Sequence, residues 1–542
     1  MLDSSPPASC RGVIGYWVVV VLAVGVGIMP LVPPAPGGGT ATTDFSVDRA
    51  LDHISLVAAA PHPLGSSRNE RVAAYLASEL QTVGLKVERQ RVAATDYFGD
   101  GSALTAVNVM ARITGTDPTG AVAVVGHYDS TPVAPGANDD ATAVAIMLEV
   151  ARVVSDMPPL RNDVILLFTD GEEPAPRFGS TAFVERHPWA GDVEFVVNLE
   201  AIGSTGPSFL TATAGPDRWV VDQYLGGARH PTAFSFVTAV ESLLGGSNTD
   251  FAPFREAGIA GLELVYLHGS PVYHTAADRP GRVGHRSLYQ HGTNTLDIVL
   301  HVADSDLTLP RDATPVAFVT IARSIVIDYP AGWNLVAAAL TGAFAAGLVL
   351  TRRRTLHTAR ESVLVVGVAL SLSGAAALTW TLLAGWRDTM GVVESYSYLV
   401  AVSALAIVTQ AAILRRDTER WPAPSPEAIV VTWWMLAAGT VMVEPSLATP
   451  FVLTSFAAAI AVSARRRLGG STTSVVVASG AALVAVVLIV PMVDFFHQLA
   501  QPRPGNPDSE VLATGALPVL GILLLADVIL ALRPAARTTV AP

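Results

Sequence analysis

This sequence is nearly without cysteine and lysine, since Cys10 and Lys86 are the only examples among 542 residues. A single cysteine excludes an intrachain disulfide, so any metal site in the chain must be built from His, Asp and Glu. The formal net charge is −12, whereas nucleic-acid binding needs a basic stripe. We therefore expect no nucleic-acid partner and look for function among the histidines and carboxylates.

Charged residues as a whole are also scarce. They make up 15% of the chain, while hydrophobic residues make up 51%; a soluble domain has about 25% charged residues. Membrane-spanning segments are the usual cause of such a composition. Arginine supplies almost all of the positive charge, a bias that we interpret as that of a GC-rich bacterial genome.

Long uncharged apolar runs divide the chain into three parts. Residues 13–32 are long enough to cross a bilayer, and we interpret them as a retained anchor rather than a cleaved signal peptide. The predicted parts are an anchor and linker at 1–43, a water-exposed domain at 44–330 and an all-α membrane domain at 331–542. Seven further spans are expected in the last part, at 332–351, 361–385, 395–414, 427–443, 448–464, 473–493 and 512–532.

Arginine clusters in the connections between these spans predict their orientation. Every second connection or tail carries one: Arg352–Arg354 with Arg360, Arg415–Arg416 with Arg420, Arg465–Arg467, and Arg533 with Arg537. The intervening connections hold only Arg387 and Arg503. Because positive residues stay on the cytoplasmic side, and Arg11 precedes the first span, both termini are predicted to be cytoplasmic. Residues 44–330 then lie outside the cytoplasm of an integral protein of the bacterial plasma membrane.

Residues 44–330 alternate between strand-like and helix-like segments. Five short apolar runs bounded by turn or polar residues predict buried strands at 121–125, 164–168, 193–199, 209–213 and 262–266. Helical patterns lie at 141–154 and 180–186, and 47–85 is predicted to be mainly helix, interrupted at 61–65. Strands that alternate with helices predict an α/β domain whose mostly parallel sheet is sandwiched by helices.

Two chemically active segments lie near the first of these strands. His127 follows the strand at 121–125, at the carboxyl edge where α/β folds bind ligands. Asp129 lies on the same side if strand geometry continues, and can accept the other ring N–H of the histidine. Asp139 and Asp140 come just before the helix at 141–154, where acids can also act simply as caps for free N–H groups.

Three later segments follow the remaining strands. Glu172 and Glu173 come after a glycine at the end of the strand at 164–168; adjacent carboxylates raise each other's pKa unless a cation compensates them. Glu200 interrupts an apolar strand end, and His274 follows the strand at 262–266. Each segment alone can be a solvated loop, but five at successive strand ends and a helix start indicate a shared site.

Together these segments supply two imidazoles and three carboxylates, which suit zinc. The set is His127, Asp139, Glu173, Glu200 and His274. Five ligands are too many for one open tetrahedral ion, whereas a carboxylate shared by two ions gives three contacts to each and leaves a place for a bridging water. A glutamate beside a ligand can serve as the general base.

The five ordered segments resemble the co-catalytic dizinc exopeptidase family, which includes aminopeptidases, glutamate carboxypeptidase and glutaminyl cyclase. The resemblance covers about residues 45–300, and segments 63–66 and 246–251 also look like family segments. It implies one zinc held by His127, Asp139 and Glu200, and a second held by Asp139, Glu173 and His274.

The same resemblance assigns roles to three further residues. Glu172 would be the general base, Asp129 the partner of His127, and Tyr273 a group that stabilises the oxyanion. One departure is Glu200, where many secreted members have aspartate. Glutamate is typical of the membrane-bound branch, which resembles the vacuolar membrane protease and the endoplasmic reticulum metallopeptidase and also places a peptidase domain before a multispanning region.

The expected function is therefore a membrane-bound dizinc exopeptidase, with aminopeptidase activity expected, two zinc ions per chain, a peptide substrate and the lipid bilayer as partners. The sequence leaves the oligomeric state open. One alternative is a single-zinc enzyme of the glutaminyl cyclase type, and another is a peptidase-like receptor or transport protein without catalysis. The complete ligand set favours two zinc ions and hydrolysis. Asp527, inside the last predicted span, marks either a polar pathway or a helix–helix hydrogen bond.

Overall fold

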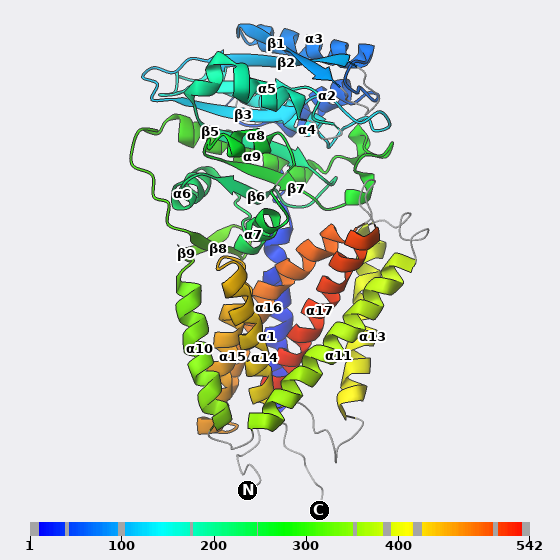
Figure 1. Ribbon diagram of the computed structural model, residues 1–542, viewed down its shortest axis with the longest axis vertical. Helices are drawn as coiled ribbons and strands as arrows, with labels where there is room; N and C mark the ends of the chain where they lie inside the picture. The colour runs from blue at the N-terminus through cyan, green and yellow to red at the C-terminus, as the bar shows by residue number, and fades with distance from the viewer. Residues whose placement is uncertain are drawn as a thin grey trace, which may run out of the picture.

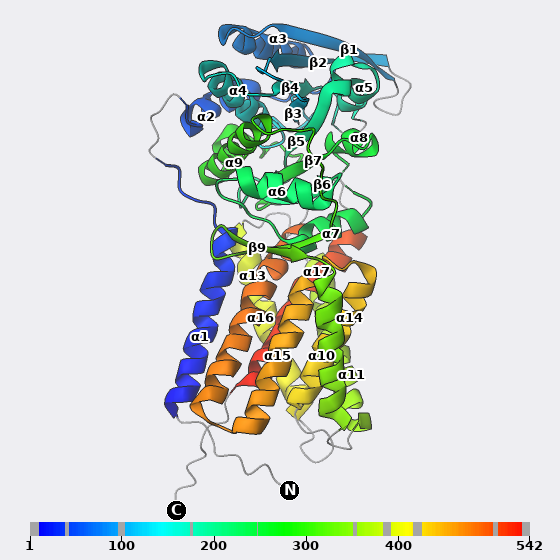
Figure 2. The same cartoon turned by 90° about the vertical axis from the view of Figure 1, so that its left-hand side faces the viewer.

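The computed structural model describes residues 10–37, 43–95, 103–173, 177–246, 248–350, 355–382, 392–415, 425–501 and 508–533. An α/β region and a bundle of long helices are stacked along the long axis of the molecule (Figure 1). The first helix, α1 (Cys10–Ile28), lies along one side of the bundle and packs against α16 (Thr472–Leu499), although the α/β region follows α1 in the chain (Figure 2). The chain therefore runs along the side of the bundle before it forms the α/β region.

Seven strands form the main sheet, in the order β1-β2-β4-β3-β5-β7-β6. Its centre is parallel and consists of β3 (Ala121–His127), β4 (Asp163–Thr169), β5 (Val193–Ala201) and β7 (Gly261–Tyr266). The edges are antiparallel and consist of β1 (Val87–Thr95), β2 (Ala103–Ile113) and β6 (Phe209–Ala214). The predicted α/β class with a mostly parallel, helix-covered sheet is confirmed.

The alternation of side chains along each strand builds two cores. In β3, Val122 and Val124 point to one face, and Ala121, Ala123 and Val125 point to the other. The first face is covered by α2 (Val47–Val57), α3 (Ser67–Thr82), α4 (Ala141–Asp156), α6 (Asp217–Gly227) and α9 (His285–Ala303). The second face is covered by α5 (Phe178–Arg186) and α8 (Phe251–Glu256) (Figure 2). Both faces of the central strands are therefore buried, as a parallel sheet requires.

The C-terminal bundle contains seven described helices, and each predicted span falls on one of them. They are α10 (Trp333–Leu350), α11 (Thr355–Leu382), α13 (Val392–Arg415), α14 (Pro426–Val443), α15 (Thr449–Leu468), α16 (Thr472–Leu499) and α17 (Asp508–Leu532). Within the described chain, four segments are long and apolar enough to cross a membrane: Arg11–Leu31, Arg360–Leu382, Pro426–Val443 and Thr472–Leu499. The predicted helical region with several apolar helices is confirmed, while the domain boundaries at 44 and 330 stay predictions.

The arginine clusters are only partly visible. Arg360 lies in α11, Arg415 ends α13 and Arg465–Arg467 form the last turn of α15. Arg533 follows α17 (Asp508–Leu532) directly, whereas the clustered Arg352–Arg354, Arg416, Arg420 and Arg537 lie outside the described residues. The lone Arg387 and Arg503 of the intervening connections also lie outside them. The orientation that these residues predict therefore stays a prediction.

The α/β region rests on the bundle through an apolar contact. Phe234, the N-cap residue of α7 (Ser235–Leu243), and Phe236, within α7, belong to the same buried cluster as Val486 and Phe495 of α16. The rings of Phe236 and Phe495 are 5.7 Å apart between centroids. A hairpin of β8 (Val316–Ile321) and β9 (Ile325–Pro330) lies between the sheet and the bundle (Figure 2).

Candidate metal centre

The carboxyl ends of the four parallel strands carry most of the predicted site residues. His127 ends β3, Glu200 is the second-last residue of β5, and Glu172 and Glu173 follow β4. His274 lies on the loop after β7. Because parallel strands end at one edge of the sheet, these side chains meet although they lie far apart in the sequence.

Asp139 lies at the centre of the cluster and faces both histidines. Its Oδ1 is 3.1 Å from Nε2 of His127, and its Oδ2 is 3.2 Å from Nε2 of His274. The residue precedes α4, whose N-cap is Asp140, and the Asp140 side chain accepts a hydrogen bond from the N–H of Ala143. The two neighbouring aspartates thus have different contacts: Asp140 caps the helix, and Asp139 faces the histidines.

His274 and Glu173 form the second half of the cluster. Nε2 of His274 lies 2.6 Å from Oε1 of Glu173. The backbone of His274 is left-handed, with φ of 56°, a conformation that is uncommon outside glycine and that often marks a functional site. The ring of Tyr273 stacks on the imidazole with centroids 3.7 Å apart, so the predicted oxyanion residue borders the same site.

Glu200 also lies beside His127. Two groups of three described residues have ligand atoms within 4.8 Å of one another, namely His127 with Asp139 and Glu173, and His127 with Asp140 and Glu200. Oε1 of Glu200 and Oδ2 of Asp140 are buried without a hydrogen-bond partner. Buried polar atoms normally have partners, so these two oxygens indicate a ligand at this position.

Asp129 contacts His127 in a different way from the sequence prediction. The nearer partner of the His127 Nδ1 atom is the main-chain carbonyl of Asp129, at 3.0 Å, and the carboxylate Oδ1 lies 3.6 Å away. The carboxylate instead accepts hydrogen bonds from the main-chain N–H groups of Glu172 and Glu173, at 3.2 and 3.1 Å. Asp129 therefore fixes both the imidazole and the turn that carries the two glutamates.

Two further acidic residues, to which the sequence pattern gave no role, support this site. Asp278 accepts hydrogen bonds from the main-chain N–H groups of Asn138 and Asp139, at 2.9 and 3.2 Å. Asp250 accepts a hydrogen bond from the hydroxyl of Thr169, at the end of β4. Both aspartates belong to motifs visible in the sequence, but their partners are too distant along the chain for spacing to reveal them. Ser247, in the motif at 246–251, lies outside the described residues.

Burial and like charge dominate the electrostatics of the glutamates. Burial, together with the charge of Asp139, raises the pKa of Glu173 to about 7. Burial also raises the pKa of Glu172, and burial with the charge of Asp140 raises the pKa of Glu200. These shifts have the direction expected for carboxylates that are crowded together away from water.

The pKa values of the two histidines are raised, although burial alone would lower them. Burial by itself would lower the pKa of His274, but its hydrogen bonds with Asp139 and Glu173 raise that pKa to about 10. Burial would likewise raise the pKa of Asp139, but the two histidines hold that pKa below its usual range. Each histidine therefore provides positive charge that the carboxylates attract.

The donor set fits a divalent cation. The site holds more buried carboxylates than histidines; each carboxylate is at most 7% exposed, and they are Asp139, Asp140, Glu172, Glu173 and Glu200. Two imidazoles compensate only part of this charge. A divalent ion would supply the rest, and a mixture of histidine nitrogen and carboxylate oxygen suits zinc.

Comparisons with known proteins agree with this donor set. Residues 108–299 match the family described as Peptidase family M28. Endoplasmic reticulum metallopeptidase 1 of Mus musculus is 31% identical over 312 residues, which cover 53% of this chain and 34% of that protein. Vacuolar membrane protease of Candida albicans (strain WO-1) is 34% identical over 245 residues, which cover 45% and 29%. The chain thus spans about a third of the length of the curated relatives it matches.

Among solved structures, an aminopeptidase from Aneurinibacillus sp. strain AM-1 is 16% identical, covers 50% of this chain and 98% of its own, and superposes with a TM-score of 0.41. The family match spans β3, β4, β5 and β7, whose ends hold His127 and Glu200, as well as the loop with His274. Residues 108–299 therefore form a domain of peptidase family M28, and the relationship to the endoplasmic reticulum metallopeptidase and the vacuolar membrane protease that the motifs indicated is confirmed.

Proposed function

We propose that this protein is a membrane-bound zinc metallopeptidase, an exopeptidase of the aminopeptidase type that hydrolyses peptide bonds with two zinc ions. One observation carries the proposal: the two carboxylate oxygens of Asp139 face two different histidines, His127 at 3.1 Å and His274 at 3.2 Å. A carboxylate in that position can be shared between two ions.

We base the ligand assignment on the contacts of the two histidines that face Asp139. On one side, Nε2 of His127 lies with Oδ1 of Asp139. The ligand atoms of His127 also lie close to those of Glu200, whose unpartnered Oε1 is available to an ion. On the other side, His274 and Glu173 lie with Oδ2. We assign three ligands to each zinc, with Asp139 in both sets.

The residues around the metals have separate tasks. Zinc, when bound, polarises a carbonyl and lowers the pKa of a water molecule. Glu172 takes the proton of the attacking water and returns it to the leaving amine; its turn is held by the hydrogen bond from its N–H to Asp129. The phenol of Tyr273, next to His274, donates a hydrogen bond to the developing oxyanion.

The proposal is tested by counting metals and measuring turnover in the same samples. We expect two zinc ions per chain and release of the amino-terminal residue from a panel of aminoacyl substrates, with activity lost after chelation and regained with zinc. The Glu172→Gln variant should keep both zinc ions and lose about 10²–10⁴-fold in kcat, because only the proton acceptor changes. A Glu185→Gln variant, exposed on α5, serves as the matched control.

Two results would contradict the proposal. Near-normal turnover of Glu172→Gln with full zinc content would remove Glu172 from the base role. One zinc per chain without hydrolysis of any aminoacyl or peptide substrate would instead favour the single-zinc or the non-catalytic alternative.

We also propose that the α/β region lies outside the cytoplasm and that both termini lie inside it. The described part of the bundle supports this orientation, because Arg465–Arg467 end α15 at its final turn, whereas the opposite end of α16 meets the α/β region through Phe495. A peptidase in that position acts on peptides on the outer face of a bacterial plasma membrane.

A further inference from the structure

One hydrogen bond joins the membrane bundle to the loops of the metal centre. Nε2 of His268 lies 2.9 Å from Oδ2 of Asp494, across 226 positions of sequence. His268 follows β7 by two residues and precedes His274 by six, whereas Asp494 lies on α16. Both residues are buried, at 8% and 6% exposure. The contact therefore lies within the protein rather than on a solvated surface.

Asp494 is held in place by two bundle helices. Its Oδ1 accepts a hydrogen bond from the hydroxyl of Tyr396, on α13, and that hydroxyl also accepts one from Nε2 of Gln498 at 2.8 Å. One turn along α16, His497 contacts Ser395 Oγ at 3.3 Å and Gln501 Nε2 at 3.1 Å. The carboxylate is thus part of a network that joins α13 and α16.

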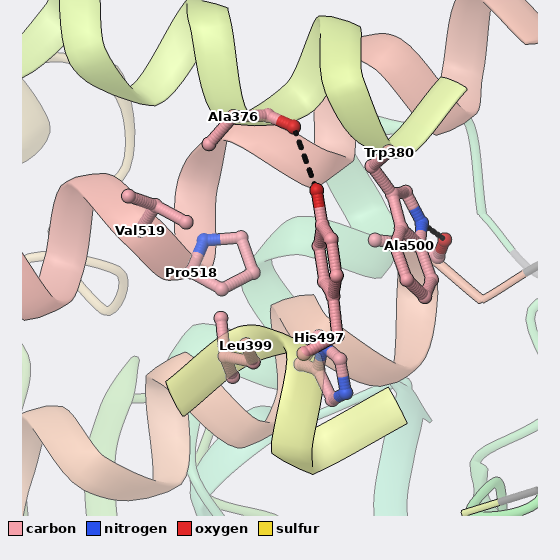
Figure 3. A pocket seen from close by; sticks show the side chains of 8 residues that line it. Ala376, Trp380, Leu399, His497, Ala500, Pro518 and Val519 are labelled. Carbon is pink, nitrogen blue, oxygen red and sulfur yellow. Dashed lines mark hydrogen bonds between the residues drawn. The ribbon is translucent and has the colours of Figure 1, made fainter. Parts of the chain in front are cut away.

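The same end of α16 is packed on its other side. His497 lies at the edge of a small pocket, and the indole N–H of Trp380 donates a hydrogen bond to the carbonyl of Ala500 at 2.9 Å (Figure 3). These contacts bring α11 against the end of α16 as well. Asp494 therefore faces His268 from a helix end that hydrogen bonds join to both α11 and α13.

The backbone of His268 ties two active-site loops together. Its N–H donates to the carbonyl of Thr205 at 3.0 Å, and its carbonyl accepts from the N–H groups of Ser204 and Thr205 at 2.8 and 2.9 Å. Ser204 lies four residues after Glu200, on the loop that leaves β5. His268 is therefore the point at which the loop after Glu200 meets the loop before His274.

A glycine shows how closely the imidazole packs on the first of these loops. Gly206 has φ of +95°, and a Cβ added there would lie 2.5 Å from Cγ of His268. A side chain at position 206 would collide with the ring, so the turn closes directly beneath the imidazole. The ring is thus confined between this turn and Asp494.

We propose that Asp494 is a positioning residue for the metal centre: through His268 it fixes the loops that carry Glu200 and His274, so that the membrane bundle sets how tightly the site holds its metal. The inference rests on the proposed function only in taking the metal to be zinc. Ligand loops that are fixed before binding lose less conformational entropy when the ion binds. Loss of the hydrogen bond between His268 and Asp494 therefore lowers the affinity for the metal without changing any ligand.

The test compares Asp494→Ala with Asp527→Ala in the full-length protein in detergent or nanodiscs. Asp527 is a matched control, because it is another bundle carboxylate and accepts a hydrogen bond from Gln410 at 2.7 Å, away from His268. We expect Asp494→Ala to bind zinc roughly tenfold more weakly in competition with a chelator, and Asp527→Ala to bind it as the wild type does. His268→Gln, whose amide can still donate to Asp494, should lie between the two.

Amide hydrogen exchange of the zinc-free protein gives an independent readout. Segments 203–206 and 267–272 should exchange roughly tenfold faster in Asp494→Ala and stay unchanged in Asp527→Ala. If Asp494→Ala does not accumulate, Tyr396→Phe, which removes only the hydroxyl bonded to Asp494, should give a smaller increase in the same segments. Unchanged exchange and unchanged zinc affinity would overturn the inference. Because exchange is measured without metal, it tests whether the contact between Asp494 and His268 fixes the two loops, even if the wild type binds no zinc and the proposed function fails.

Discussion

At the scale of single residues, the site shows a conflict between stability and binding. Glu200 is buried next to Asp140, its Oε1 has no hydrogen-bond partner, and burial raises its pKa. Such a carboxylate costs free energy in the metal-free protein. A metal-binding carboxylate is expected to have these properties in the metal-free protein, whereas a structural carboxylate normally accepts hydrogen bonds from the protein itself.

The variant Glu200→Gln separates these two explanations. The amide has the same shape without the charge, so we expect the metal-free variant to be more stable than the wild type by about 1–2 kcal/mol. Zinc content and turnover should fall, because one ligand of the site with His127 is weakened. Thermal unfolding with and without zinc measures both effects. A variant that loses stability and still binds zinc normally would identify Glu200 as structural.

Asp278 offers a second residue-scale test. Its carboxylate accepts hydrogen bonds from Asn138 Nδ2 at 2.7 Å and from the main-chain N–H of Asp139 at 3.2 Å. Asp278→Ala frees the segment that carries Asp139, so we expect kcat/KM to fall about 10–100-fold with weaker zinc binding. Asp304→Ala, an exposed aspartate at the end of α9, is the control. Equal activity of the two variants would show that Asp278 does not position Asp139.

At the scale of elements, the sequence predicted the buried strands best. The runs that became β3, β4, β5 and β7 are apolar almost throughout, because both faces of a central parallel strand are covered. The strand β1 was not predicted, because Val87–Thr95 lies at the sheet edge and combines exposed charged residues with only a few buried ones. The antiparallel direction of β6 was also invisible, because hydrophobicity carries no information on strand direction.

The direction of the parallel strands also explains which residues of the site could be predicted to lie together. His127, Glu173 and Glu200 could be placed together because parallel strands deliver their ends to one edge. Hydrogen bonds that cross more than a hundred positions, such as that from Asn138 to Asp278, depend on loop conformation. No spacing rule gives loop conformation, so the support of the site became visible only in the structure.

Helix α9 carries an element-scale prediction about pH. His291 is buried within it, its Nδ1 lies 2.8 Å from Ser208 Oγ, and burial lowers its pKa to about 3. The unfolded chain binds a proton below about pH 6.5, but the folded chain does not until about pH 3. This histidine therefore makes the protein less stable as the pH falls through that window.

Replacement of this histidine should make the protein less sensitive to acid. Between pH 6.5 and pH 5, protonation of His291 in the unfolded chain lowers the free energy of unfolding of the wild type by about 2 kcal/mol. The His291→Gln variant should not show this loss, whatever its stability at neutral pH. Melting temperatures at both pH values, with the exposed His285→Gln as control, measure the difference. An identical acid response of His291→Gln and wild type would show that His291 takes up its proton without unfolding.

At the scale of the whole molecule, the bundle and the α/β region share one buried apolar cluster. Phe209, Phe234 and Leu267 of the α/β region are buried with Phe495 and Val486 of α16. The bundle therefore packs directly against the unit that carries the candidate metal centre. Asp527 hydrogen-bonds to Gln410 between α17 and α13, which is the helix–helix contact considered from the sequence.

The orientation of this assembly can be measured with the natural scarcity of cysteine. In a Cys10→Ser background, a single cysteine is placed at Ser78, exposed on α3, or at Thr473, exposed in the first turn of α16. Thr473 lies 21 residues before Asp494, about 30 Å along the helix and thus at the far side of a bilayer core. In intact cells, a membrane-impermeant maleimide should label Ser78→Cys and should label Thr473→Cys only after permeabilisation, because Arg465–Arg467 hold the neighbouring connection in the cytoplasm. The reverse pattern would place the α/β region and its metal centre inside the cell, and the proposed action on outer peptides would be wrong.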